Sequence, residues 1–136
     1  MLKKDFIQRQ LEEFGKVMAV ILNFKKNKDW ENFEKELNLA SIKYSLYELN
    51  KIEEMSLNDF KINVLGKTNT TNDEQKIMAD LMFEKMNYYF ETNEIEKAEM
   101  LKDKCILLYT FYKENLTLTE FNLDLHYKLQ VLNKMK

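Results

Sequence analysis

The sequence contains no proline and only two glycines among its 136 residues. Proline interrupts a helix because it lacks a backbone N–H and clashes with the preceding turn, and glycine weakens one through its backbone freedom. With so few interruptions, apolar residues recur at a period near 3.6 along most of the chain. The sequence predicts a single all-α domain over residues 1–136, with about five antiparallel helices in a bundle.

Cysteine and histidine occur once each, as Cys105 and His126. A lone cysteine excludes an intrachain disulfide, and a zinc site would need carboxylates for most of its ligands. The sequence therefore predicts no metal site and no cofactor. Cys105 falls on the apolar face of a predicted helix and is expected in the core, whereas His126 stands at the edge of such a face.

Long hydrophobic runs are also missing, since the longest uninterrupted apolar stretch is Val17–Leu22. A membrane-spanning helix needs about 20 apolar residues. No apolar segment with a small-residue cleavage site follows the first lysines. We expect a soluble cytoplasmic protein without stable membrane insertion.

The net charge of −2 conceals an uneven distribution of charge along the chain. Residues 1–28 carry seven basic and three acidic side chains, and the remaining 108 residues carry 14 and 20. A basic first helix is attracted first to the acidic body of its own chain. The composition therefore does not favour nucleic-acid binding.

The apolar spacing and the capping residues predict where each helix begins and ends. Helices are expected over about 3–24, 29–54, 71–90, 95–112 and from 117 onward, with Asp29, Thr71 and Thr117 as N-caps. The segment 55–73 is the best loop candidate, although Ser56 can cap a short helix over 56–65. Helix 29–54 carries two apolar stripes, so it is expected at the centre of the bundle.

The first predicted helix is apolar nearly all round from Val17 onward, so more than one neighbour must cover it. Gly15 lies in its interior, where glycine costs about 1 kcal/mol relative to alanine. A glycine inside a helix is typical of positions where another backbone approaches too closely for a larger side chain. We expect a close neighbour at Gly15, and self-association through this helix is an alternative.

The join between the third and fourth predicted helices has Tyr89, Asn93, Ile95 and Ala98 at a distinctive spacing. This pattern resembles the centre of a tetratricopeptide repeat, in which a small residue lets the second helix pack closely. Asparagine replaces the usual turn glycine and tolerates the same left-handed conformation. The resemblance covers about residues 79–112, and the fifth helix would then act as a cap.

Some positions depart from the repeat, because Lys102 replaces an aromatic, Met86 replaces a small residue and no proline follows. The resemblance implies a concave side that holds a peptide, lined by Asp80, Phe83, Glu84, Asn87 and Phe90. The alternative is that Phe83 and Phe90 pack on the first or second helix. The opening residues 1–14 also resemble a group of small uncharacterised bacterial helical proteins, which implies a fold but no activity.

These observations predict a non-enzymatic module that binds a peptide or a helix of a protein partner on a helical groove. Methionines at 78, 82, 86 and 100 favour adaptable contacts. Two alternatives stay open. One is a homodimer formed through the first helix, and the other is a small enzyme of unknown reaction that uses His126.

Overall fold

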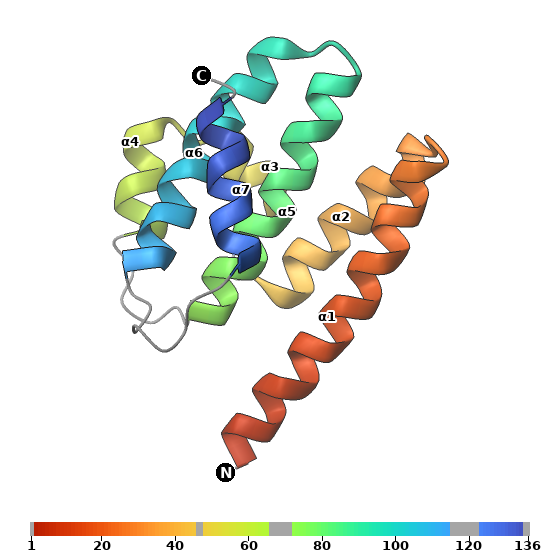
Figure 1. The fold of residues 1–136 in the computed structure, drawn as a ribbon, viewed down its shortest axis with the longest axis vertical. Coiled ribbons are helices and arrows are strands. Elements are labelled where there is room, and N and C mark those ends of the chain that lie inside the picture. The colour runs from red at the N-terminus through yellow and green to blue at the C-terminus, as the bar shows by residue number, and fades with distance from the viewer. Residues whose placement is uncertain (1, 46–47, 66–71, 115–122, 135–136) are drawn as a thin grey trace.

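The computed structural model describes residues 2–45, 48–65, 72–114 and 123–134 (Figure 1). Within these ranges the chain forms helices and no strand, which confirms the all-α prediction. The α-helices are α1 (Leu2–Lys26), α2 (Trp30–Tyr44), α3 (Leu49–Glu54), α4 (Leu57–Phe60), α5 (Asn72–Glu91), α6 (Ile95–Glu114) and α7 (Leu123–Lys134), and the π-helical turn η1 (Lys61–Leu65) follows α4. No helix in the described ranges is long and apolar enough to cross a membrane.

Helix α5 is the central helix of the bundle. It forms an antiparallel hairpin with α6 and also packs against α2 and α3, whereas α1 packs mainly on α2 and α7 on α6 (Figure 1). Its side chains Leu81, Met82 and Met86 have no exposed surface. The prediction that helix 29–54 lies at the centre is wrong. The side chains of Leu39 and Ile42, from its second stripe, are 49% and 55% exposed.

The predicted helix 29–54 is divided into α2 and α3. Near the end of α2 the Ser41 hydroxyl donates to the Asn38 carbonyl and accepts the backbone N–H of Leu49. The Ser45 hydroxyl donates to the Ser41 carbonyl, and the Ser45 backbone is extended. Serine side chains that bond to nearby backbone groups compete with helix continuation, and here they end the helix.

Several predicted helix starts are confirmed. The Asp29 carboxylate accepts the backbone N–H of Asn32, and the Ser56 hydroxyl accepts that of Asp59. The loop expected over 55–73 is helical as far as residue 65, where Phe60 and Val64 are buried. The predicted caps Thr71 and Thr117 lie outside the described residues.

The two helical hairpins turn through left-handed residues. Asn93, between α5 and α6, has a φ of 64°, as the sequence predicts. Lys28, between α1 and α2, has a φ of 56°. A residue with a Cβ atom adopts this conformation at a cost of about 1–2 kcal/mol, which asparagine lowers through local hydrogen bonds.

Replacing Asn93 tests this turn. Asn93→Ala should lower the free energy of unfolding by about 1 kcal/mol, because alanine is strained at positive φ. Asn93→Gly is the matched control and should leave the stability close to that of the wild type. Urea unfolding followed by circular dichroism measures both. Equal stability of the alanine and glycine variants would contradict the assignment.

Candidate functional site

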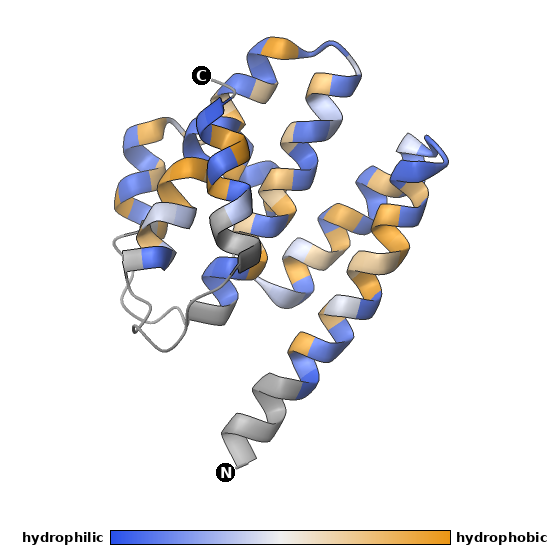
Figure 2. Cartoon of the chain, in the orientation of Figure 1, coloured by the Kyte–Doolittle hydropathy of each residue, from blue (hydrophilic) through white to orange (hydrophobic). Residues whose placement is uncertain are grey.

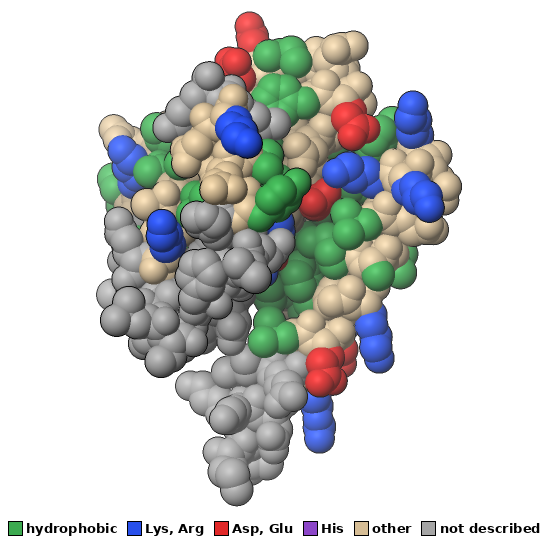
Figure 3. Space-filling model, viewed as in Figure 1, with side chains coloured by type: hydrophobic (Ala, Val, Ile, Leu, Met, Phe, Trp, Pro, Cys, Tyr) green, Lys and Arg blue, Asp and Glu red, His purple; other side chains and the backbone are tan. Residues whose placement is uncertain are grey.

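A groove of about 570 Å³ runs between α1 on one side and α5 and α7 on the other. Its lining comprises Leu11, Phe14, Gly15, Met18, Ala19 and Leu22 from α1, Lys76, Ile77, Asp80 and Glu84 from α5, and Lys128 from α7. Figure 3 shows hydrophobic side chains gathered where α1 faces the rest of the bundle. The groove is therefore mainly apolar on its α1 wall and charged on its α5 wall.

The α1 wall is built by helical spacing. Leu11, Gly15, Met18 and Leu22 follow one another at steps of four, three and four residues, which places them on one face. This face remains open, since Leu11 is 38% exposed and Leu22 is 41% exposed. In Figure 2 the turns in the second half of α1 contain many residues coloured as hydrophobic.

Gly15 lies in the middle of this open face. A Cβ atom built on Gly15 would meet no atom within 4 Å. The expected close approach of another backbone is therefore not met by the described part of the chain. The interior glycine and the free space above it have no explanation within the packing of α1 on α2.

The α5 wall contains a buried carboxylate, Asp80, whose side chain is 8% exposed. Lys76 Nζ lies 2.9 Å from Oδ2, Lys128 Nζ lies 2.8 Å from Oδ1, and the Tyr109 hydroxyl donates to Oδ1. A buried charge is tolerated only when it is paired and hydrogen-bonded. These contacts join α5 to α6 and α7.

Burial alone would raise the pKa of Asp80, because it disfavours the charged carboxylate. The charges of Lys76 and Lys128 and their hydrogen bonds act in the opposite direction and together outweigh burial. The pKa of Asp80 therefore lies below its ordinary value, and the group is a carboxylate at neutral pH.

Two further charged residues of α5 reach the neighbouring helices. Glu84 pairs with Lys25 of α1 at 2.9 Å, and Lys85 pairs with Glu34 of α2 at 3.1 Å. The Lys25–Glu84 pair connects the two walls of the groove. The charges of the α5 wall are therefore already engaged within the chain.

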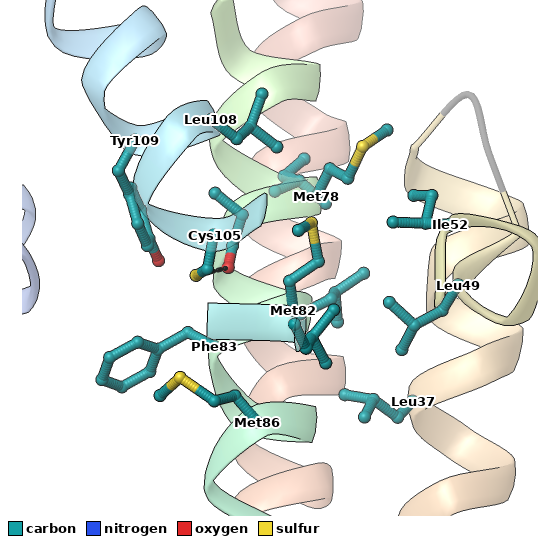
Figure 4. Packing of buried hydrophobic residues seen from close by; sticks show 14 of the residues in the cluster. Leu37, Leu49, Ile52, Met78, Met82, Phe83, Met86, Cys105, Leu108 and Tyr109 are labelled. Atoms are coloured by element: carbon teal, nitrogen blue, oxygen red, sulfur yellow. Dashed lines mark hydrogen bonds between the residues drawn. The ribbon is translucent and has the colours of Figure 1, made fainter. Parts of the chain in front are cut away.

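The structure separates the five predicted site residues. Asp80 and Glu84 line the groove, whereas Phe83, Asn87 and Phe90 do not. Phe83 is 7% exposed, with its ring centroid 6.5 Å from that of Tyr109 and 5.4 Å from Lys128 Nζ (Figure 4). An open position for Phe83 is wrong because α6 and α7 cover it.

The remaining two residues, Asn87 and Phe90, are half-buried. Phe90 packs against the hydrophobic core. Packing of Phe83 on the first or second helix stays a prediction, and the structure adds ring contacts with Tyr109 of α6 and Lys128 of α7. The α1 wall is not among the five predicted site residues, although the first helix was an alternative surface for self-association and the steps of four, three and four from Leu11 to Leu22 place these residues on one face.

A second hollow, of about 350 Å³, lies between α3, α5 and α6 beside Lys104. Lys104 Nζ donates to the carbonyls of Ile52 at 2.7 Å and Glu53 at 3.1 Å, at the end of α3. Burial lowers the pKa of Lys104, although the nearby Glu53 charge opposes this. The lysine stabilises the carbonyl end of α3, so we assign it a structural role.

Cys105 is fully buried, which confirms its predicted place in the core, and its thiol lies 3.6 Å from the Ala79 carbonyl (Figure 4). Burial raises the pKa of the thiol, and the charge of Asp80 adds to this. Nowhere in the described ranges do three or more His, Cys, Asp or Glu side chains gather to hold a metal ion. The His126 side chain lies outside the described residues.

No family model, curated protein or solved structure matches the chain. The resemblance of residues 79–112 to a tetratricopeptide repeat therefore stays a prediction.

The lowered pKa of Asp80 predicts a pH dependence of stability. The folded chain binds fewer protons at Asp80 than the unfolded chain, so acid weakens the fold below about pH 4. Asp80→Asn should lower the free energy of unfolding at pH 7 by about 3 kcal/mol. The free energy of unfolding of this variant should also fall less between pH 7 and pH 2.5 than that of the wild type. Urea unfolding between pH 7 and pH 2.5 measures both effects.

Asp103, which is exposed on α6, offers the control. Asp103→Asn should leave the acid limb of the stability curve as in the wild type. An Asp80→Asn variant with the same acid dependence as the wild type would show that the Asp80 pairs do not contribute.

The burial of the Cys105 thiol predicts that it is modified slowly in the native protein. Modification of Cys105 by a disulfide reagent should be at least about 100-fold slower in the native protein than in urea, because the thiol is inaccessible and its pKa is raised. An Asp103→Cys variant supplies an exposed thiol, which should react at once. Rapid labelling of Cys105 under native conditions would contradict the packing of α6 on α5.

Proposed function

We propose that this protein is a non-enzymatic interaction module that binds a helix of a protein partner in the groove between α1 and the α5–α7 wall. The observation that carries the proposal is the open apolar face of α1. Leu11 and Leu22 are partly exposed on it, and free space lies above Gly15. The residues that the structure describes leave this face of α1 partly exposed, so it can contact a partner.

A helix suits the shape of this groove. One wall is the length of α1 from Leu11 to Leu22, which spans about 17 Å at 1.5 Å per residue. Grooves between helices commonly receive the apolar face of an amphipathic helix, which contacts them through residues three and four apart. Gly15 and Ala19 remove side-chain bulk and let the two helix axes approach closely.

A small polar ligand suits the groove less well. Small-molecule sites place a few polar groups where they can hold the ligand. Here Asp80 is paired with Lys76 and Lys128, and Glu84 is paired with Lys25. These polar groups are neutralised by one another, which leaves apolar surface as the main source of binding energy.

The binding free energy expected from this apolar surface corresponds to a moderate affinity. Complete burial of a leucine side chain contributes about 1.5–3 kcal/mol, so a partly exposed one gains on the order of 1 kcal/mol. A few such contacts correspond to the micromolar range once the cost of association is met. The antiparallel α5–α6 hairpin, with its tetratricopeptide-like turn at Asn93, also supports a binding role.

Selection of helical peptides tests this proposal. A phage-displayed library of amphipathic helices is selected on the immobilised wild-type protein, and the enriched peptides are measured by fluorescence polarisation. Leu22→Glu should weaken their binding at least about tenfold, because a charge then lies on the apolar wall. Leu22 is 41% exposed, so the variant should keep its fold, as circular dichroism can verify.

Ile62 on η1 is 69% exposed and is not part of the groove. Ile62→Glu is therefore the matched control and should leave peptide binding unchanged. Peptides that bind the wild type and Leu22→Glu equally well would refute a binding role for this groove.

A further inference from the structure

We infer that the helix received by this groove is α1 of a second copy of the chain, running antiparallel to the first. The inference rests on the proposed function, because it requires that the groove accept a helix. The two-fold axis passes between Met18 and Ala19, so the two helices overlap over residues 11–26.

The two α1 faces are complementary in the size of their side chains. About this axis, Leu22 of one copy faces Gly15 of the other, and Met18 faces Ala19. Each large side chain therefore meets a small one, and the symmetry repeats both pairs. The space above Gly15, where an added Cβ would meet nothing within 4 Å, accepts the Leu22 side chain that one copy leaves 41% exposed.

The two α1 helices are also complementary in charge. The same register brings Glu12 of one copy beside Lys26 of the other, and both residues are exposed in the single chain. The first half of α1 carries Glu12 and Glu13, and its last turn carries Lys25 and Lys26. An antiparallel pair brings these opposite charges together, whereas a parallel pair would place like charges side by side.

The proposed overlap covers the open face of α1 along its length. Residues 11–26 of two antiparallel helices overlap for about 23 Å. The overlap includes all the groove-lining residues of α1. Self-complementarity of this kind is required of an interface between identical copies, whereas a foreign helix needs no such symmetry in α1.

Gly15→Leu tests the register. Light scattering on the wild type at about 50 µM should give twice the 16.5 kDa mass of the chain, and Gly15→Leu should give the monomer mass. The variant is expected to fold with an equal or higher melting temperature, since a Cβ atom at this position meets no atom within 4 Å and leucine favours the helix.

Lys16 is exposed and does not line the groove, so Lys16→Leu is the matched control and should remain a dimer. A Gly15→Leu variant that is folded and dimeric would overturn the inference, because the register cannot accommodate a leucine there.

A charge exchange distinguishes a second copy from any other partner. Glu12→Lys alone and Lys26→Glu alone should each weaken dimerisation several-fold, because each homodimer then pairs like charges twice. Mixing the two variants should restore association, since the mixed dimer pairs opposite charges at both sites. Fluorescence transfer between differently labelled variants measures the mixed dimer.

Failure of this inference can be told apart from failure of the proposed function. A wild-type protein that stays monomeric at about 100 µM would overturn self-pairing. Selected helical peptides that still require Leu22 would then leave the groove as the site of a different partner. No gain on mixing the charge variants would also overturn the antiparallel register.

Discussion

The carboxylate of Asp80 is charged inside the bundle, and the arrangement of three helices depends on its neutralisation. Lys76 comes from the same helix, Tyr109 from α6 and Lys128 from α7. Buried ion pairs rarely add much net stability, but a misplaced partner leaves an uncompensated charge at a cost of several kcal/mol. The network therefore acts mainly on specificity, because other packings of α6 and α7 on α5 would separate these groups.

Ion pairs also connect α5 to the two helices in the first half of the chain. Glu84 and Lys85 pair with Lys25 on α1 and Glu34 on α2. Helix α2 also contributes the fully buried Phe33 and Leu37 to the core, whereas α1 contacts the α5 wall mainly through one ion pair. Helix α1 is thus held along one side, and the other side is left as the wall of the groove.

The sequence predicts features that are decided locally. The caps at Asp29 and Ser56 and the left-handed turn at Asn93 depend on neighbouring residues, and the structure confirms all three. Periodicity cannot show which of two apolar stripes is buried, so the exposure of Leu39 and Ile42 was not foreseen. The break after α2 could be suspected only from two serines that are also common within helices.

The site was harder to predict because its parts are distant in the sequence. Lys128 is 48 residues from Asp80, and Lys25 is 59 residues from Glu84. No local pattern shows that these groups pair. Phe83 was expected on an open surface because the repeat register assigns it to the concave side, whereas its ring lies against Tyr109 of α6 and Lys128 of α7.

Lys28 makes the connection between α1 and α2 a point of local weakness. Its positive φ is unfavourable for a lysine, and α1 makes few contacts with the central helix that would compensate for this. Native-state hydrogen exchange would accordingly begin in α1, while the amides of α5 remain protected until global unfolding. The position of the α1 wall beside the groove therefore depends mainly on the packing of α1 against α2 and on the Lys25–Glu84 pair.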